Sequence, residues 1–419
     1  MRSPDTAKHV RELRFYGKGY HERIDNPERK LRPTQKKVPQ YIFEAKPKVD
    51  KSITGSKPLL EKAMRGMRLS DKERKSVLGR DSDLDFIIAI IIVHCPNLRL
   101  LHLGVDLLHE NTFLPKVCYH YFGLEAGASI SVLMKLEGVH LAQDIRYGSS
   151  YDKSEPLTLS LSLCLPFFYV PSLETLSAPL PDSIGYHRPP LPHTEWPTST
   201  PPISIVRTLD LHNTRAKPAT LAFLLAQTPH LRSLRYNHWC DYMDQEKLDC
   251  AQLRNALHSV SSTLAELTIS LDPFSNEAAA TDEINTWVVD QRGIGSLAFL
   301  PHLTKLEIAL PILIDWSGES GLSLEDVLPS TLEVLCLRDD CVNYHCMIWA
   351  EEPTIGLVRR WLENKAWKKH TPSMKRFGLR LIHSSSDEWG TQARNALKYI
   401  CKSEGLEFWF EKQHLEYER

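Results

Sequence analysis

The chain has 419 residues, of which 42% are hydrophobic and 25% are charged, as in ordinary folded proteins. The longest apolar run, Phe86 to Val93, is too short to cross a bilayer, which takes about 20 residues. No apolar signal segment follows the polar start of the chain, and the nine cysteines lack disulfide spacing. These features exclude a secreted disulfide framework. They predict a cytoplasmic or nuclear protein with no membrane contact.

Charge divides the chain into a basic head and an acidic body. Residues 1–80 hold 22 Lys and Arg against 10 Asp and Glu, whereas the remaining residues hold 29 against 42. We expect residues 1–58 to form one strand followed by a disordered basic loop, and residues 59–419 to form the main domain. The basic cluster at 29–32 would also suit a nuclear signal or a nucleic-acid contact. Because no aromatic residues alternate with the basic ones, we favour a charged linker and expect no nucleic-acid binding.

One pattern of apolar residues, apolar-x-x-apolar-x-apolar, recurs along the chain. An early copy is Val10, Leu13 and Phe15, and a weaker last copy begins at Leu406. Nine copies lie between these two, and their starts are 25 to 42 residues apart. The first residues of the nine are Leu98, Leu136, Leu173, Val206, Leu231, Leu264, Leu303, Leu332 and Met374.

The spacing within this pattern predicts a short strand. The last two apolar positions are two residues apart and therefore point to the same face of a strand, while the first turns the chain into it. A single unit cannot bury that face alone and must stack on its neighbours. The sequence therefore predicts an α/β leucine-rich-repeat solenoid. We expect a horseshoe of about ten short parallel strands, with irregular repeats and with helices on the convex side.

Helices are expected between the strands, because apolar residues recur there at helical spacing. Prolines stop these helices just before the next strand, as in Pro229-His230-Leu231 and Pro301-His302-Leu303. The expected helices span residues 83–93, 218–228, 248–260, 282–299, 355–367 and 391–401.

Several repeats carry an aspartate at the ninth position, where this fold normally has Asn or Cys. A carboxylate there accepts backbone N–H bonds at the turn but, unlike Asn, cannot donate one. We therefore expect a degenerate ladder of turn-capping residues, made of Asp106, Asp144, Asp272 and Asp340.

Residues 179–202 contain eight of the 27 prolines and are predicted to form a loop inserted between two repeats. The stretch Pro189-Pro190-Leu191-Pro192 would suit a WW or SH3 module in extended form. Most proline-rich loops bind nothing, and we favour that interpretation here.

Three stretches resemble the F-box leucine-rich-repeat proteins that fungi carry in large numbers. Residues 7–15 resemble the first strand after the F-box, residues 84–98 resemble the helix that leads into a "CPNL" strand, and residues 229–234 resemble the standard repeat opening. The resemblance covers most of the chain, although each motif is generic. It implies the substrate receptor of a cullin-type ubiquitin ligase, in which the F-box binds the adaptor and the repeats hold the substrate protein.

The F-box itself is not among the few residues before Val10. We therefore expect binding to a cullin-ligase adaptor only if an F-box is missing from the gene model. The first interpretation is a non-catalytic protein-binding scaffold that resembles the substrate-holding repeats of such a receptor. The alternatives are an orphan leucine-rich-repeat interaction protein with no ligase link, and an unrecognised enzyme.

Residues between the strand leucines should point to the concave face of the solenoid. Neighbouring strands lie about 4.8 Å apart, so residues at equivalent positions form rows. We expect this face to bind a protein partner, with arginines as anchors because guanidinium forks suit carboxylates. Charge reversal of Arg235 together with Arg338 is expected to weaken capture of that partner. One row is predicted to run His102, His140, Ser177, Asp210, Arg235. The candidate residues are His102, His140, Asp210, His212, Arg235, Lys305, Glu307, Arg338, Arg376 and Arg380.

No cofactor and no metal site are expected. Cys336, Cys341, His345 and Cys346 have the spacing C-x4-C-x3-H-C, with Cys336 on the exposed strand face. This is not a usual zinc-finger spacing, so we interpret these as buried or incidental thiols.

No catalytic site is expected either. The sequence has no Gly-rich phosphate loop, no G-x-S-x-G elbow and no H-E-x-x-H motif. Asp210, His212 and a serine such as Ser233 would have to meet on the concave face to form a triad, because triads assemble in space. We favour a non-catalytic protein.

Overall fold

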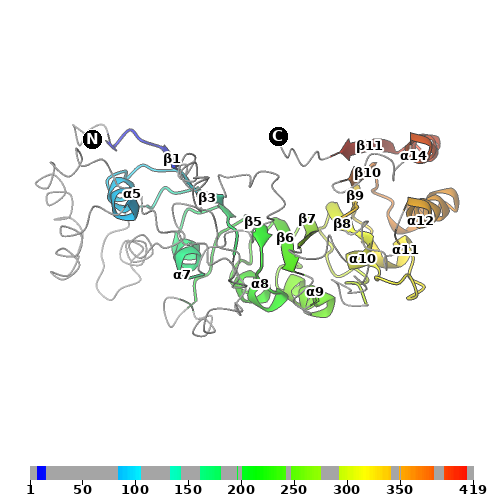
Figure 1. Ribbon diagram of the computed structural model, residues 1–419, viewed down its shortest axis with the longest axis horizontal. Helices are drawn as coiled ribbons and strands as arrows, with labels where there is room; N and C mark the ends of the chain where they lie inside the picture. The colour runs from blue at the N-terminus through cyan, green and yellow to red at the C-terminus, as the bar shows by residue number, and fades with distance from the viewer. Residues whose placement is uncertain are drawn as a thin grey trace, which may run out of the picture. The chain divides into compact units, whose positions relative to one another are not determined.

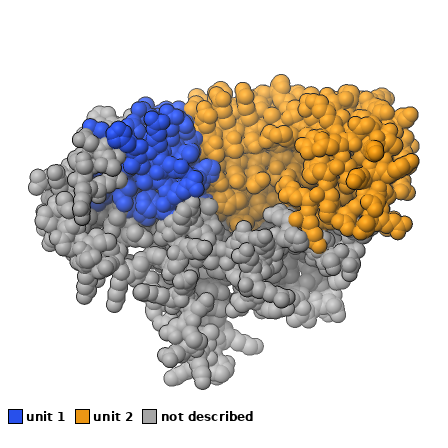
Figure 2. Space-filling view, turned by 90° about the horizontal axis from the view of Figure 1, so that it is seen from above, with its two compact units in different colours: residues 1–145, 162–173, 197–199 blue, residues 146–161, 174–196, 200–419 orange. Residues whose placement is uncertain are grey.

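The structure is a computed structural model of the 419-residue chain. It describes residues 7–15, 84–104, 133–142, 161–180, 196, 201–241, 247–274, 292–340, 349, 351–381 and 391–412. The described strands form one open sheet of eleven parallel strands in chain order (Figure 1). The chain divides into unit 1, residues 1–145, 162–173 and 197–199, and unit 2, residues 146–161, 174–196 and 200–419 (Figure 2). The predicted α/β repeat fold of parallel strands is confirmed.

Each strand contains the second apolar position of one copy of the sequence pattern. All eleven predicted strands, including the early copy and the weak last one, are therefore confirmed. Unit 1 holds β1 (Glu12–Phe15), β2 (Leu100–Gly104) and β3 (Gly138–Ala142). Unit 2 holds β4 (Thr175–Ser177), β5 (Thr208–Thr214), β6 (Ser233–Asp241), β7 (Glu266–Phe274), β8 (Lys305–Ala309), β9 (Val334–Arg338), β10 (Arg376–Leu381) and β11 (Glu407–Lys412).

The register of the sheet places equivalent leucines beside one another. Leu209 lies beside Leu234, and the same row continues through Leu267 and Leu306 to Leu335. Each of these five side chains is at most 1% exposed. Burying a leucine stabilises a fold by roughly 1.5–3 kcal/mol, so this ladder is the main contribution of the repeat pattern to stability.

A recurring backbone arrangement leads the chain into the strands. The carbonyl of Arg207 accepts hydrogen bonds from two successive amides, those of Arg232 and Ser233, at 2.8 and 2.9 Å. The carbonyl of Glu333 does the same for Lys375 and Arg376, at 2.8 and 3.1 Å. Because the arrangement also occurs at Arg11, Arg99, Glu174, Arg232, Ala265 and Thr304, the repeats are equivalent in backbone geometry despite their different lengths.

In unit 2 the described helices lie on one side of the sheet (Figure 1), and the strand leucines are buried. They are α8 (Pro218–Leu225), α9 (Cys250–His258), α10 (Leu310–Leu313), α11 (Leu324–Val327), α12 (Glu351–Glu363), α13 (Ala366–His370) and α14 (Thr391–Ser403). Earlier in the chain are α5 (Leu84–Val93), α7 (Leu161–Cys164) and the 3-10 helix η2 (Leu165–Tyr169). No helix among the described residues combines the length and the apolar composition needed to cross a membrane.

The sequence locates most of these helices, because their apolar residues recur at helical spacing. In α14, Ala393, Leu397 and Cys401 recur at four-residue spacing and are buried. The segment predicted as one helix over 355–367 is two, because the chain turns at Lys365, whose φ is 56°.

The helix predicted over 282–299 is wrong for residues 292–299, and residues 282–291 lie outside the described part. Residues 293–295 instead run beside residues 312–314, to which all three donate backbone hydrogen bonds of 2.7 to 3.0 Å. Two glycines explain the difference. A Cβ at Gly293 would overlap the carbonyl of Ile314, and Gly295 has a φ of +70°, which favours glycine.

Candidate partner-binding face

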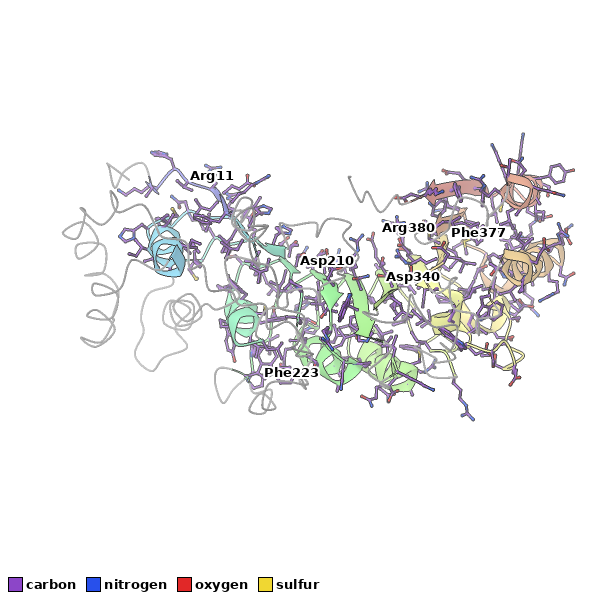
Figure 3. All side chains as sticks on the ribbon, viewed as in Figure 1. Arg11, Asp210, Phe223, Asp340, Phe377 and Arg380 are labelled. Carbon is purple, nitrogen blue, oxygen red and sulfur yellow. The ribbon has the colours of Figure 1, made fainter. Side chains whose placement is uncertain are left out.

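The side chains that alternate with the strand leucines lie on the side of the sheet away from the described helices. We call this surface of β4 to β11 the open face. Figure 3 shows Asp210, Asp340 and Arg380 on this side and Phe223 on α8. The register joins one row across unit 2, which runs Ser177, Asp210, Arg235, Thr268, Glu307, Cys336, Gly378, Trp409. The predicted sequence of neighbours Ser177, Asp210 and Arg235 is confirmed.

A groove of about 410 Å³ crosses the open face. This volume lies within the range of roughly 300–1,000 Å³ that is usual for ligand sites. Four of the predicted site residues line the groove, namely Asp210, Arg235, Lys305 and Glu307. The rest of its lining comes from β5, β6, β7, β8, β9 and β11.

Trp409 forms one end of the groove, and the sequence analysis did not single it out. A Cβ at Gly378 would overlap the indole ring of Trp409, so the ring lies directly on the backbone of β10. The guanidinium of Arg376 lies over the same ring, 4.9 Å from its centre, and also contacts Glu407 at 3.1 Å. The bare backbone at Gly378 and the Arg376 guanidinium therefore hold the indole in place.

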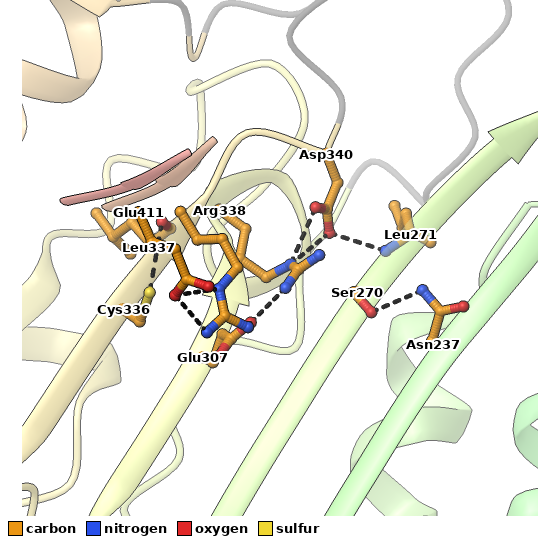
Figure 4. Close-up of polar contacts among 10 residues, drawn as sticks. Asn237, Ser270, Leu271, Glu307, Cys336, Leu337, Arg338, Asp340 and Glu411 are labelled. Carbon is orange, nitrogen blue, oxygen red and sulfur yellow. Dashed lines mark hydrogen bonds and ion pairs between the residues drawn. The ribbon is translucent and has the colours of Figure 1, made fainter. Parts of the chain in front are cut away.

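At the groove, five charged side chains form a partly buried network (Figure 4). Glu307 accepts from Arg338 and, at 2.6 Å, from Arg380, which also contacts Glu411 at 2.8 Å. Both carboxylate oxygens of Asp340 accept from Nε of Arg338, at 2.9 and 3.0 Å. Arg338 was expected to face a partner, but only 7% of its side chain is exposed.

The pKa of Arg338 shows which effect dominates in this network. Burial disfavours its charge, but the carboxylates of Asp340 and Glu307 outweigh burial and raise the pKa of Arg338. Arg338 is thus held as an internal cation. Replacing it would disrupt the fold as well as the surface, so Arg338 is a poor residue for a binding test.

Cys336 lies on the open face between Glu307 and Gly378 but is only 3% exposed. Burial, with a further contribution from Glu307, raises the pKa of its thiol to about 12. The thiol is therefore protonated at neutral pH and is neither a nucleophile nor a ready metal ligand.

The two other candidate cations that line or border the groove differ in their pairing. Nζ of Lys305 contacts Glu266 at 2.5 Å, and both side chains are about half exposed. Arg235 is exposed, and it forms no hydrogen bond or ion pair with any residue that the structure describes. Arg235 is thus free to bind a ligand.

Ser177, Asp210 and His212 lie together at the β4–β5 end of the open face. The Ser177 hydroxyl is 3.4 Å from Oδ2 of Asp210 and 3.2 Å from Nδ1 of His212. In a catalytic triad the histidine lies between the serine and the aspartate. Here the hydroxyl lies between the other two, so the aspartate does not orient the histidine for proton transfer. Ser233, the serine suggested from the sequence, belongs to the next strand.

In unit 1 the register places His102 beside His140, as predicted. Their rings stack with centres 4.7 Å apart, and Nε2 of His102 lies 3.4 Å from Glu12. Burial and the nearby Arg14 lower the pKa of His102, although Glu12 acts in the opposite direction. The neutral form of His102 is therefore favoured at neutral pH.

Several predictions lie outside the described residues. These are the basic loop at 17–58, the Pro189–Pro192 stretch, the capping role of Asp106 and Asp144, and the thiols Cys341 and Cys346 with His345. Among the residues that are described, no group of three or more His, Cys, Asp or Glu is placed to hold a metal ion. Within the insertion at 179–202, Trp196 stacks on Phe223 of α8, with ring centres 4.7 Å apart.

No family model matches the chain, and no curated protein matches it either. The fold and the groove are therefore the observations on which a function is argued. Partner binding by the ten candidate residues stays a prediction.

Proposed function

We propose that this protein is a non-catalytic scaffold that holds a protein partner on the open face of unit 2. The observation that supports this most is the groove, which is built from side chains of six strands and has the mixed polar and apolar lining of an interface. A parallel sheet with helices on one side offers such a surface because the repeats place equivalent residues in rows.

The chemistry of the groove favours binding over catalysis. Glu307 and Glu266 have their carboxylates occupied by cations, and the thiol of Cys336 is protonated. The Ser177 cluster lacks the order of a triad. The side chains that remain accessible are suited to recognition.

The more specific proposal is that the chain is the substrate-holding part of an F-box ubiquitin-ligase receptor. It rests on the sequence resemblance and on the eleven-strand parallel repeat fold. Adaptor binding would require an F-box that joins these residues in the native gene product. A stand-alone repeat protein with the same face and no ligase link is the alternative.

The test is capture of native partners with the tagged full chain. We compare the wild type with the pair Arg235→Glu and Lys305→Glu, which reverses two groove cations. The matched control is the pair Arg232→Glu and Lys375→Glu, because both residues are exposed and neither lines the groove.

We expect the groove variant to capture at least tenfold less of one partner protein than the wild type does. The control variant should capture as much of it as the wild type. Equal capture by both variants would contradict the proposed function. A cullin adaptor among proteins captured by the native gene product would support the ligase role. A groove-dependent partner without the adaptor would support the stand-alone scaffold.

A further inference from the structure

The charges in the groove point to the chemistry of its ligand, provided that the proposed function holds. Of the charged side chains that line the groove, Glu266 and Lys305 pair with each other, and Glu307 binds Arg338 and Arg380. Each of these charges is already compensated within the protein. Among the described lining residues, the charges without an ion-pair partner are Arg235 and its strand neighbour Asp210.

Asp210 is the strand neighbour of Arg235 but does not compensate its charge. The register places the two residues side by side, yet no ion pair joins them within 4 Å. Oδ2 of Asp210 accepts from Ser177, while Oδ1 is buried and has no hydrogen-bond partner in the described structure. The Arg235 guanidinium is thus left with its five donors available to a ligand.

An arginine with free donors on a groove wall selects for a carboxylate. The guanidinium fork matches a carboxylate in two parallel hydrogen bonds, which makes the pair stronger and more specific than a lysine contact. A cationic side chain from the ligand would meet Arg235 with like charge, and an apolar one would leave its donors unsatisfied.

The other end of the groove supplies an apolar contact. Trp409 lines the groove, and the guanidinium of Arg376 lies over its ring. The Trp409 indole lies over Gly378 of β10, which is four strand-to-strand steps from Arg235 on β6, or about 19 Å at 4.8 Å per step. An extended peptide segment of about six residues spans that distance at 3.3–3.6 Å per residue.

We propose that the groove binds an extended peptide segment of a partner protein, with an Asp or Glu on Arg235 and an apolar side chain at Trp409. The carboxylate and the apolar side chain would lie about six positions apart. The backbone between them would cross Thr268, then Glu307, whose carboxylate is held by Arg338 and Arg380, and then Cys336.

The probe is a random seven-residue peptide library displayed on phage and panned on the folded full chain. We expect enriched peptides to carry Asp or Glu at one end and an apolar residue at the other. Panning on Arg235→Glu should replace the acidic residue with Lys or Arg, whereas panning on Arg232→Glu, the exposed control on the same repeat, should leave it unchanged. Trp409→Ala should remove the apolar preference and keep the acidic one.

The affinity of one enriched peptide then measures how much Arg235 contributes to binding. In fluorescence polarisation, Arg235→Glu should weaken it at least tenfold, and Arg235→Ala should weaken it less. Because Arg235 is exposed and unbonded, both variants should keep the wild-type circular dichroism spectrum.

Three outcomes would overturn the inference: no enriched peptide, enriched peptides without an acidic preference, or an acidic preference that persists in Arg235→Glu. The proposed function would still stand after any of these outcomes if the Arg235→Glu and Lys305→Glu double variant fails to capture the native partner. If that native partner is also kept, the open face itself is the wrong surface.

Discussion

Oδ2 of Asp340 accepts a hydrogen bond of 2.9 Å from the backbone amide of Leu271, which lies 69 residues earlier in the chain. Asp340 follows β9 and Leu271 belongs to β7, so the bond joins two strands that are not neighbours. The bond is possible because β8, the strand between β7 and β9, ends at Ala309, about one residue short of Leu271 in the register. β7 continues to Phe274. The same carboxylate holds Arg338 of its own repeat, and Arg338 in turn contacts Glu307 on β8, so together Asp340 and Arg338 connect three repeats.

Replacing this carboxylate should strongly destabilise unit 2. In Asp340→Ala the buried Arg338 loses its main counter-charge and the Leu271 amide loses its acceptor. Removing one partner of a buried ion pair costs about 3–5 kcal/mol, and we expect a loss in this range in urea unfolding. Asp340→Asn keeps an acceptor for Leu271 and should cost less.

Asp249→Ala is the control for the Asp340 variants. Asp249 caps α9 by accepting from the amide of Gln252 at 2.8 Å, and losing such a cap costs about 1 kcal/mol. If Asp340→Ala costs no more than this control, the cross-strand connection does not contribute as the structure implies.

Gly378 should be the least replaceable glycine of the open face. In Gly378→Ala the new methyl group would overlap the Trp409 indole, so we expect a loss of about 1–3 kcal/mol. In a Trp409→Ala background the same change should cost much less, because the methyl group then has space. Equal costs in the two backgrounds, measured by urea unfolding, would contradict the contact.

Gly356→Ala serves as the control for this cycle. Gly356 lies inside α12, and a methyl group there would meet only the Arg360 side chain at 3.7 Å. Alanine is favoured over glycine in a helix by roughly 0.8–1 kcal/mol, so we expect this variant to be as stable as the wild type or more stable.

The strands were predictable because the information is local. In each copy the second and third apolar positions decide which face of a strand is buried, and three residues are enough to locate it. The helix expected over 282–299 is wrong at residues 292–299, because its apolar spacing does not reveal that Gly293 must approach the carbonyl of Ile314. Close approach to a distant backbone is a property of the folded chain.

The sequence predicts which residues lie on the open face, but it does not predict which of them pair with one another. Sequence spacing correctly made Asp210 and Arg235 neighbours. Nothing local shows that Arg338 is held between Glu307 and Asp340, or that Arg235 has no partner among the described residues. The role of Trp409 had a usable signal. In the copy of the pattern that begins at Leu406, the second and third apolar positions are Phe408 and Phe410, which share one face of the strand and leave Trp409 on the other.

Acid should destabilise the protein through His238. Burial, helped by Arg215 and Lys217, lowers the pKa of His238 from 6.5 to about 4, and its ring lies 3.0 Å from the Tyr236 hydroxyl. The unfolded chain therefore takes up a proton at a higher pH than the folded one. The contribution of neutral His238 to the free energy of unfolding is fully present above pH 6.5. It is lost as the pH falls from 6.5 towards 4, and the loss amounts to at most about 3 kcal/mol.

His238→Gln is the variant that isolates this effect, because glutamine does not titrate. We expect the wild type to lose more stability between pH 7 and pH 4 than the variant does, in urea unfolding at several pH values. Parallel curves for the two proteins would show that His238 is protonated in the folded state or is not buried.

Three cysteines should resist alkylation in the folded protein. Burial raises the pKa of Cys164, Cys336 and Cys401 to about 12, so each thiol is both inaccessible and protonated. Iodoacetamide labelling at pH 8, followed by peptide mass spectrometry, should modify them only after denaturation. Fast labelling of Cys336 in the native protein would mean that the groove floor is open to solvent.

The most direct test of the central claim is site-specific photo-crosslinking in cells. A photoreactive phenylalanine analogue replaces Thr268, which lines the groove, or Tyr399, which is 75% exposed on α14 on the helical side. We predict a crosslinked protein partner from position 268 and none from position 399. A partner that crosslinks from position 399 and not from position 268 would show that the protein binds through its helices, and would contradict the open face as the binding surface.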